Sequence, residues 1–472
     1  MALAYTLAGS LLGAILFYIY LMQSRPDLLP WHLVELKHEF SIEKSSDIDS
    51  FSEYLSLEEK LFEELQQKIY LKQLEKKQYQ LVRYDSGSLA DPTAHDFNWN
   101  RSFELPHDKP IAGALLLHGL SDSPYSLRTV AKTLHKQGFY VLGLRMPGHG
   151  TIPSGLVHSS WQDMAAAVKL AARHLNQRLG SDQEMHIIGY SMGAAQAVNY
   201  ALDSLQDKSL PGAESLVLIS PAIGVSSVAA LAVWQSRLSN IPGLEKLAWN
   251  SIGPEYDPYK YNSFAVNAGD LMYRLTLTIS DKLGQLEEQQ RKNEFPRTQV
   301  FLSAVDATVS TSAVIRHLLD RVDNDGNELI VFDINRNDNV IPFLQKDPGE
   351  VLDVLMKDTT LKFRLSLLTN ESPDSLFLEE KNRERDKTLY IHKLNISWPS
   401  SIYSLSHVAL PFPVNDSLYG GDPDDLYQLH IGLISPRGEK GVLSVHASDT
   451  QRLRYNPFYN YLQQRIEDFL RL

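Results

Sequence analysis

Short apolar runs alternate with amphipathic, helix-forming stretches through the middle of this 472-residue chain. A stretch such as Ser160–Leu179, which Gly180 ends, has helical periodicity, and similar stretches separate most of the apolar runs. This alternation predicts an α/β fold with a mostly parallel central sheet and helices on both faces. The predicted strands are Ile111–Leu117, Phe139–Leu144, Met185–Tyr190, Ser215–Ser220, Gln299–Val305 and Glu328–Asp333.

Two long stretches interrupt the alternation, and we treat both as insertions in a domain that spans residues 111–472. The first insertion, residues 221–296, follows the fourth strand, where a lid could cover a site. Its aromatic residues either form a small core of their own or line a substrate site. They are Trp234, Trp249, Tyr256, Tyr259, Tyr261, Phe264 and Tyr273.

The second insertion, residues 335–400, contains two further runs that have strand character. Lys362–Leu368 and Thr388–Leu394 are predicted to pair with each other and to extend the edge of the sheet. The pattern of this insertion indicates no function.

The N-terminal stretch from Leu3 to Met22 carries no charge and is long enough to cross a bilayer, which needs about 20 apolar residues. A cleaved signal peptide is the alternative. However, no Lys or Arg precedes the apolar run and no A-x-A-like site follows it. We therefore predict that residues 1–24 form a retained, single-pass membrane anchor. Arg25 is the only basic residue nearby, so the side of the membrane stays open.

Residues 25–110 are predicted to form a linker followed by a helical extension. Ser56 and Glu59 have the spacing of a capping box, which would begin a charged helix that reaches about Gln78. Apolar residues recur every four positions along this helix, at Leu57, Leu61, Leu65 and Ile69. This stripe is expected to pack on the main domain, and a partner surface is the alternative.

The composition excludes several classes of function. A net charge of −12 argues against general nucleic-acid binding. The absence of cysteine excludes disulfides, thiolate metal sites and cysteine nucleophiles. No metal-ligand cluster and no phosphate-binding G-x-x-x-x-G-K is present, so we expect neither a cofactor nor a bound metal. The oligomeric state stays open.

The third predicted strand leads into Gly189-Tyr190-Ser191-Met192-Gly193, and helix-forming residues follow from Ala194 to Leu205. A G-x-S-x-G sequence between a strand and a helix is the pattern of a nucleophile elbow. A turn of small residues packed in a core can carry the same pentapeptide by chance. Ser191 is therefore a candidate nucleophile that needs an acid and a base elsewhere in the chain.

The candidate acid is Asp306, the first polar residue after the fifth predicted strand. On such a fold the acid and then the base follow the serine, each just beyond a strand. Asp306 could instead cap the helix predicted at Ser310–Arg321, and Asp333 and Asp338 are the alternative acids.

The candidate base is His407, which lies beyond Asp306 and after the last strand region. His430 and His446 lie in the same C-terminal part and stay open as alternatives. Three other histidines are expected to be structural: His118 in the loop after the first strand, His149 in a turn and His392 in a strand.

Two backbone N–H groups are needed to stabilise a tetrahedral oxyanion. The N–H of Met192, the residue after the nucleophile, is one candidate. The other is the N–H of Leu120, in the His118-Gly119-Leu120 loop after the first core strand. His118 is expected to brace this loop.

Four motifs, LLLHGLSDSPYSL, LRMPGHGTIPSGL, IGYSMGAA and DATV, occur in this order. Together they resemble the α/β-hydrolase superfamily, near the monoacylglycerol lipase, lysophospholipase and serine aminopeptidase group. The resemblance covers about Ile111–Val309 and resumes at Ser404–Pro413. It implies a triad of Ser191, Asp306 and His407, with Leu120 and Met192 at the oxyanion hole. The chain departs from the family in its N-terminal stretch and in the insertion before His407.

These observations lead to the expectation of a serine hydrolase that cleaves carboxylic esters through an acyl-enzyme on Ser191. An apolar lid and a membrane anchor favour lipid-like acyl esters, such as monoacylglycerols or lysophospholipids. A thioesterase or a peptidase would use the same triad. A non-catalytic binding protein with the same fold is the alternative from a different class.

Overall fold

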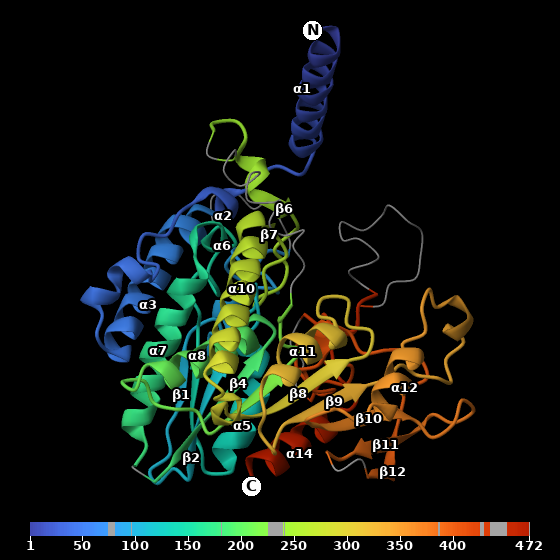
Figure 1. Cartoon of the computed structure of the whole chain (residues 1–472). Coiled ribbons are helices and arrows are strands. Elements are labelled where there is room, and N and C mark those ends of the chain that lie inside the picture. Colours follow the sequence, from blue (N-terminus) through green and yellow to red (C-terminus); the bar gives the residue numbers. More distant parts are fainter. Residues whose placement is uncertain are drawn as a thin grey trace.

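A computed structural model describes residues 1–73, 81–95, 97–180, 182–224, 239, 241–385, 388–424, 429–434 and 451–471 of the chain. Within these residues a ten-stranded sheet has the order β1-β3-β2-β4-β5-β8-β9-β10-β11-β12 (Figure 1). The strands are β1 (Phe103–Leu105), β2 (Ala112–Leu117), β3 (Tyr140–Leu144), β4 (Glu184–Tyr190), β5 (Ser215–Ile219), β8 (Arg297–Ser303), β9 (Glu328–Phe332), β10 (Arg364–Asn370), β11 (Phe377–Arg383) and β12 (Leu389–Ser397).

The centre of the sheet, from β3 to β10, is parallel throughout. Antiparallel strands flank it, with β1 at one edge and β11 and β12 at the other. The six strands expected from the apolar runs lie within two residues of their predicted positions. The predicted mostly parallel α/β sheet is therefore confirmed.

Helices cover both faces of the sheet, and the side chains on both faces of its central strands are apolar and buried. Leu115 and Leu117 of β2 belong to the core on the face that carries α7 (Trp161–Arg178), α8 (Met192–Gln206) and α10 (Val266–Glu288). Ala114 and Leu116 belong to the core on the face that carries α5 (Arg128–Lys136) and α14 (Tyr459–Leu470). This split follows the two-residue period of a strand, and both faces are apolar because both are covered. The helices are α1 (Ala2–Gln23), α2 (Pro30–Leu33), α3 (Phe51–Leu65), α4 (Leu71–Gln73), α5 (Arg128–Lys136), α6 (Gly155–His158), α7 (Trp161–Arg178), α8 (Met192–Gln206), α10 (Val266–Glu288), α11 (Thr311–His317), α12 (Gly349–Lys357) and α14 (Tyr459–Leu470).

The second insertion extends the sheet edge, but the predicted strand pair is wrong. β10 and β12 do not pair with each other, because β11 lies between them. The sequence of β11, FLEEKNR, is mostly polar. It therefore has no apolar run that would reveal it as a strand, and it forms because backbone partners are available on both sides.

The N-terminal extension begins its helix earlier than expected. Ser50 and Glu53 form the capping box of α3, with the Ser50 hydroxyl accepting from the Glu53 N–H at 3.3 Å. The predicted box at Ser56 and Glu59 is wrong: Ser56 lies inside the helix, and its hydroxyl donates to the Ser52 carbonyl at 2.9 Å. The same spacing occurs twice, and burial of the aromatic side chains in the first turns favours the earlier start. The expected end near Gln78 lies outside the described residues.

The apolar stripe of the extension packs as expected. Leu61, Leu65 and Ile69 are buried in a cluster that includes Ile152 of the main domain, and Leu57 packs against the larger core. The helix continues past Leu65 through a π-helical turn, Gln66–Tyr70, into α4. The extension is therefore an integral part of the fold.

The first insertion packs on the body over most of its described length. The long helix α10 lies against α8 and contributes Leu271, Leu275 and Ile279 to the core. A two-stranded sheet of β6 (Trp249–Ser251) and β7 (Phe264–Ala265) precedes it. Most of the aromatic residues that the sequence singled out are buried in this packing, and Trp234 lies outside the described residues. The lid stays a prediction.

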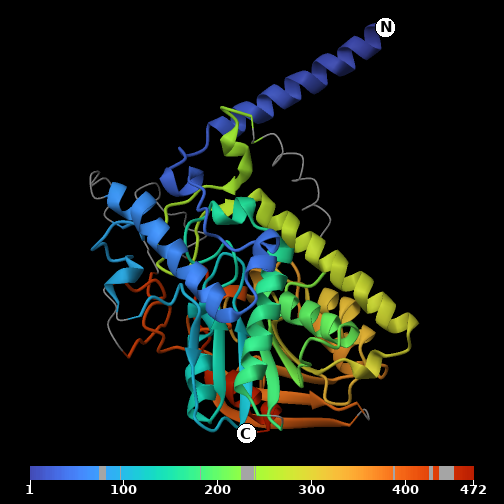
Figure 2. The same cartoon turned by 90° about the vertical axis from the view of Figure 1, so that its left-hand side faces the viewer.

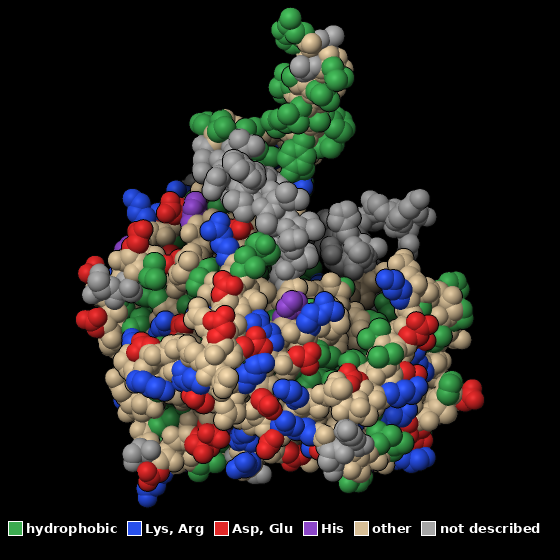
Figure 3. All heavy atoms as spheres, viewed as in Figure 1, with side chains coloured by type: hydrophobic (Ala, Val, Ile, Leu, Met, Phe, Trp, Pro, Cys, Tyr) green, Lys and Arg blue, Asp and Glu red, His purple; other side chains and the backbone are tan. Residues whose placement is uncertain are grey.

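Helix α1 is apolar and extends away from the rest of the protein (Figure 1, Figure 2). Its segment Tyr5–Gln23 has a mean hydropathy of 1.7 and is 6% buried. Hydrophobic side chains cover its surface (Figure 3). By length and composition it could cross a membrane, and a signal sequence would have the same properties. Its C-terminal end is tied to the first insertion, because the Lys246 ammonium donates to the carbonyls of Gln23 and Arg25 at 3.1 and 2.8 Å.

Candidate active site

Ser191 occupies the sharp turn between β4 and α8. Its backbone has φ 54° and ψ −113°, a conformation that is costly for a residue with a side chain. Hydrogen bonds hold it there: its N–H donates to the Ile219 carbonyl at 2.9 Å, and its carbonyl accepts from Ala222 at 3.0 Å. The predicted strand–turn–helix context of Ser191 is thus present.

Two glycines allow this turn to close. A Cβ on Gly189 would lie 2.5 Å from the Ala194 backbone, and a Cβ on Gly193 would lie 2.0 Å from the Leu117 carbonyl oxygen. Such distances are far below van der Waals contact, so neither position can carry a side chain without a backbone shift. The absence of a side chain at Gly193 lets the first turn of α8 pack against the exit of β2. The loop after β2 is thereby brought beside Ser191.

His407 lies between Ser191 and Asp306. Its Nε2 is 3.0 Å from the Ser191 Oγ, and its Nδ1 is 2.8 Å from Oδ2 of Asp306. Because a carboxylate accepts only, Nδ1 must carry the proton, which leaves the Nε2 lone pair to accept the Ser191 hydroxyl. The three side chains therefore form one hydrogen-bonded line, and both His407 and Ser191 are buried.

Asp306 is held in its ionised form. Its Oδ1 accepts the backbone N–H groups of Thr308 and Val309 at 2.8 and 2.9 Å. Burial alone would raise the pKa of this carboxyl, but the hydrogen bond and the electrostatic attraction from His407, together with the two backbone donors, lower the pKa below its ordinary value. Asp306 can thus orient His407 and stabilise a positive charge on its ring.

The alternative acids and bases lie elsewhere in the part of the chain that the structure describes. Asp333 is paired with Arg336 at 2.7 Å, and Asp338 accepts the N–H of Val340 at 2.9 Å. Neither forms a hydrogen bond with His407. His430 forms no hydrogen bond with Ser191 or Asp306, and His446 lies outside the described residues.

The loop that carries His407 is fixed by residues that sequence reasoning did not single out. The hydroxyl of Ser303, at the end of β8, donates to the Leu405 carbonyl at 2.8 Å. The ring of Tyr190 lies 5.5 Å from the His407 ring. Ser303 could have been found as a polar residue closing an apolar strand. The second insertion adds its strands at the edge of the sheet, away from the site. It therefore does not prevent the later loop from lying against the end of β8, where His407 meets Asp306.

Comparison with known proteins shows that the chain is similar to hydrolases. A model of the family described as "Serine aminopeptidase, S33" matches residues 108–334. The thermostable monoacylglycerol lipase of Bacillus sp. (strain H-257) is 30% identical over 118 residues, which are 25% of this chain and 44% of that protein. The chain has the α/β-hydrolase fold and is similar to members of that superfamily near the monoacylglycerol lipases. The matched segment spans less than half the length of this curated relative.

Solved structures of lipases and esterases are similar to this α/β hydrolase over about half of its length. One, from a study of the metagenome-derived lipolytic enzymes LipS and LipT, is 19% identical with a TM-score of 0.40, covering 55% of this chain and 98% of its own. The monoacylglycerol lipase of Paleococcus ferrophilus is 19% identical with a TM-score of 0.36, covering 49% and 89%. A soluble variant of the Saccharomyces cerevisiae monoglyceride lipase is 13% identical with a TM-score of 0.37, covering 49% and 81%.

The two backbone donors expected at the oxyanion hole of this α/β hydrolase are available. Among the described residues, none accepts a hydrogen bond from the N–H of Leu120 or of Met192. The loop that carries Leu120 is tied to the first insertion, where the Tyr261 N–H donates to the Ser121 carbonyl at 2.8 Å and Lys260 pairs with Asp122 at 2.9 Å. These two contacts fix the position of the loop that carries the Leu120 N–H.

His118 and His149 lie side by side behind this loop, with ring centroids 4.9 Å apart. Burial lowers the pKa of His118 well below its ordinary value and lowers that of His149 to about 4. Both are therefore neutral near pH 7. His118 donates from Nδ1 to the Gly119 carbonyl at 2.9 Å, and its Nε2 accepts the Met146 N–H at 3.0 Å.

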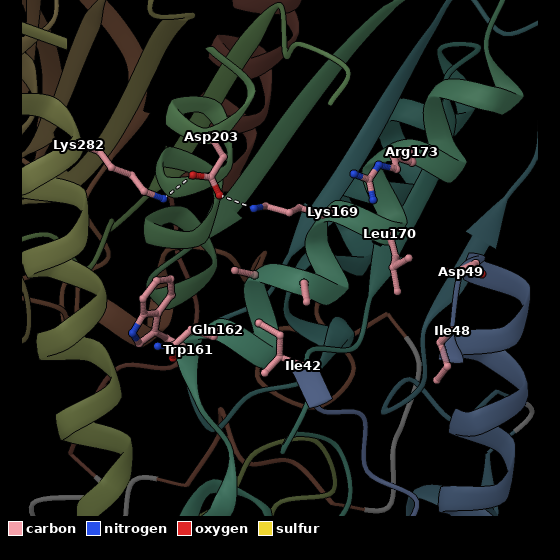
Figure 4. A pocket seen from close by; sticks show the side chains of 12 residues that line it. Ile42, Ile48, Asp49, Trp161, Gln162, Lys169, Leu170, Arg173, Asp203 and Lys282 are labelled. Carbon is pink, nitrogen blue, oxygen red and sulfur yellow. Dashed lines mark hydrogen bonds and ion pairs between the residues drawn. The ribbon is translucent and has the colours of Figure 1, made fainter. Parts of the chain in front are cut away.

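Two cavities help to locate the substrate. A small cavity beside the elbow is lined by Tyr190, Val408 and Phe412, together with Asp122, Lys260, Tyr419 and Arg454. A groove of about 500 Å³ lies along α7, where Lys169 and Lys282 share the carboxylate of Asp203 (Figure 4). Neither Ser191 nor His407 lines this groove. The small cavity, and not the groove on α7, is therefore the one that adjoins the Ser191 turn.

Proposed function

We propose that this chain is a serine hydrolase that cleaves carboxylic esters through an acyl-enzyme on Ser191. The observation that carries the proposal is the continuous hydrogen-bonded line from Asp306 through His407 to Ser191. A serine hydroxyl becomes a useful nucleophile when a base takes its proton and an acid holds that base in the correct tautomer. Both conditions are met by the contacts of His407.

In the acylation step, the Ser191 Oγ attacks the ester carbonyl carbon while His407 Nε2 accepts the hydroxyl proton. The carbonyl oxygen becomes an oxyanion, for which the N–H groups of Met192 and Leu120 are the proposed donors. The C–O bond to the alcohol then breaks, and His407 returns the proton to the leaving alkoxide. Asp306 stabilises the imidazolium that exists between these events.

In the deacylation step, a water molecule takes the place of the alcohol. His407 accepts a proton from this water as its oxygen attacks the acyl carbon. The bond to the Ser191 Oγ breaks, the proton returns to Oγ, and a carboxylic acid leaves. The same two backbone donors serve both steps, because each passes through a tetrahedral oxyanion.

Lipid-like acyl esters are the substrates we propose. The curated relative is named a monoacylglycerol lipase, although the match spans only part of it. The side chains of Val408, Phe412 and Tyr190 supply apolar surface beside the elbow. An acyl chain would bury its methylenes against such a surface.

We also propose that α1 is a single-pass anchor, with residues 25–110 as the extension that joins it to the hydrolase domain at 111–472. A helix of 22 residues is about 33 Å long, which matches a hydrocarbon core of about 30 Å. The chain after α1 docks on the loop that follows β3, where the Ser154 N–H donates to the Trp31 carbonyl at 3.3 Å. Parallel strands have their carboxyl ends on the same side of the sheet, and Ser191 follows the carboxyl end of β4 just as this loop follows that of β3. The anchor therefore leaves the body on the side of the sheet that carries Ser191 (Figure 1).

The experiment is a substrate panel on the detergent-purified full chain, with Ser191→Ala as the control. The panel contains p-nitrophenyl butyrate, a monoacylglycerol, an acyl thioester and an aminoacyl p-nitroanilide. We expect Ser191 to react with a fluorophosphonate probe and the two esters to be hydrolysed fastest. If the thioester or the anilide is hydrolysed fastest, the proposed activity becomes that of a thioesterase or a peptidase. If the probe does not label Ser191, a non-catalytic binding protein is favoured.

A further inference from the structure

We propose that the hydroxyl of Tyr54, in the N-terminal extension, begins a chain of hydrogen bonds that aims and polarises the Leu120 N–H at the oxyanion. Tyr54 lies on α3, before the segment that the family model matches. It would act as a positioning residue, through other groups and without touching the substrate. The proposal rests on the proposed function, in which Leu120 is an oxyanion donor.

The last link of the chain is the peptide between Gly119 and Leu120. The Nδ1–H of His118 donates to the Gly119 carbonyl at 2.9 Å. In a trans peptide the C=O and the N–H that follows it point in opposite directions, and the described residues contain no cis peptide. The bond that fixes the direction of this carbonyl therefore also fixes the direction of the Leu120 N–H.

The middle link is the imidazole ring of His118. A backbone N–H can only donate, so the Nε2 that receives the Met146 N–H at 3.0 Å must be the unprotonated nitrogen. The proton is then on Nδ1, where the Gly119 carbonyl needs it. Both ring nitrogens are occupied and the ring is buried, so its orientation follows the position of Met146.

The first link repeats the geometry of the last. The Tyr54 hydroxyl donates to the Arg145 carbonyl at 2.6 Å, and this carbonyl shares its peptide plane with the Met146 N–H. Burial raises the pKa of Tyr54, so it stays a protonated donor. Every bond from Tyr54 through His118 to Leu120 thus runs in the same direction. Hydrogen bonds arranged head to tail strengthen one another, by about 10–30% each.

The extension also fixes Arg145, on which the chain of hydrogen bonds depends. The guanidinium of Arg145 is 1% exposed and binds two carboxylates of the extension. Glu39 accepts from its two terminal nitrogens at 3.1 and 3.0 Å, and Glu58 accepts from Nε at 3.0 Å. A fourth hydrogen bond, donated to the His149 carbonyl at 3.0 Å, ties Arg145 to its own loop. Three side chains of the extension therefore hold both ends of Arg145.

The test is Tyr54→Phe, which removes one oxygen and keeps the ring that packs against Phe51. Tyr70→Phe is the matched control. The Tyr70 hydroxyl also lies in the extension and donates to a buried carbonyl, that of Arg83, at 2.9 Å. It has no link to His118. Both substitutions leave a buried carbonyl without its donor, so their effects on stability should be similar.

Turnover is measured on p-nitrophenyl butyrate, per active site titrated with a fluorophosphonate, so that unfolded protein does not count. Removal of an oxyanion donor costs about 100- to 1,000-fold in kcat. Loss of its alignment and polarisation should cost less, so we expect Tyr54→Phe to lower kcat about threefold to tenfold with KM unchanged. His118→Phe, which breaks two links, should lower it about 100-fold. The affinity for a trifluoromethyl ketone, which forms a tetrahedral adduct on serine, should fall by the same factor as kcat.

The outcomes separate this inference from the function on which it rests. If the unaltered chain neither reacts with the probe nor hydrolyses esters, the proposed function fails. If it is active and Tyr54→Phe keeps its full kcat per titrated site, the hydrogen-bond chain has no catalytic role. An equal loss of kcat in Tyr70→Phe would also overturn the inference, because it would assign the loss to the fold.

Discussion

Replacement of Asp306 by Asn tests the proposed triad where the structure makes the sharpest prediction. Oδ1 of Asp306 accepts two backbone N–H groups, from Thr308 and Val309, and Oδ2 faces Nδ1 of His407. In the Asn variant the amide oxygen must stay at Oδ1, because an amide nitrogen there would face two N–H donors. The NH₂ group is then directed at His407. It would donate to Nδ1 and move the ring proton to Nε2, which could no longer accept from Ser191.

The size of the effect follows from these contacts. Turning the amide to restore the original tautomer would leave the Thr308 and Val309 N–H groups without acceptors, at a cost of at least about 1 kcal/mol each. A total of about 2 kcal/mol leaves roughly one molecule in 30 with the original tautomer. The loss of kcat should therefore be at least about 30-fold, with a limit on the order of 10⁴-fold for a triad held fully in the wrong tautomer.

The assay is hydrolysis of p-nitrophenyl butyrate per site reactive to a fluorophosphonate. Asp338→Asn is the matched control, because Asp338 accepts the Val340 N–H and has no hydrogen bond to His407. It should retain the activity of the unaltered chain. An Asp306→Asn variant within threefold of the unaltered kcat would refute the tautomer argument and the role of Asp306 with it.

Three other changes have defined outcomes. Ser191→Ala should lower turnover on the order of a million-fold while circular dichroism shows the fold intact, and near-normal activity in an uncontaminated preparation would exclude Ser191 as nucleophile. Deletion of residues 1–24 should give a soluble, active enzyme, whereas recovery of the full chain in the soluble fraction after a carbonate wash would contradict the anchor. Burial alone would raise the pKa of Glu64, but the hydrogen bonds from Lys68 and from the Lys37 and His38 backbone N–H groups lower it from 4.5 to about 2. The unfolded chain therefore protonates Glu64 at a higher pH than the folded protein does, so the stability that Glu64 contributes is complete above about pH 4.5 and is lost as the pH falls to 2. The free energy of unfolding in urea should be lower for Glu64→Gln than for the unaltered chain at pH 7, and this difference should be smaller at pH 3. The same difference at both pH values would contradict the role assigned to Glu64.

Local pattern alone was enough to place the core of the fold. The central strands are continuous apolar runs because both faces of the sheet are covered, and such runs are visible without knowledge of their partners. The elbow at Ser191 is equally local, since its glycines and its strand–turn–helix setting are neighbours in the chain. The capping box was misplaced because the same spacing occurs at Ser50 and Ser56, and only burial of the first turns of α3 distinguishes them.

Contacts between distant segments decided the rest. β11 has no apolar run, and it became a strand only because β10 and β12 offered backbone partners. The sequence left several C-terminal histidines and three acids open, and the return of the chain over β8 placed His407 against Asp306 and Ser191. The path from Tyr54 to Leu120 joins three segments whose hydrogen bonds depend on the orientation of whole peptide planes. Periodicity and spacing along one chain record which faces are apolar, but they carry no information about which distant groups meet, because that depends on how the layers pack.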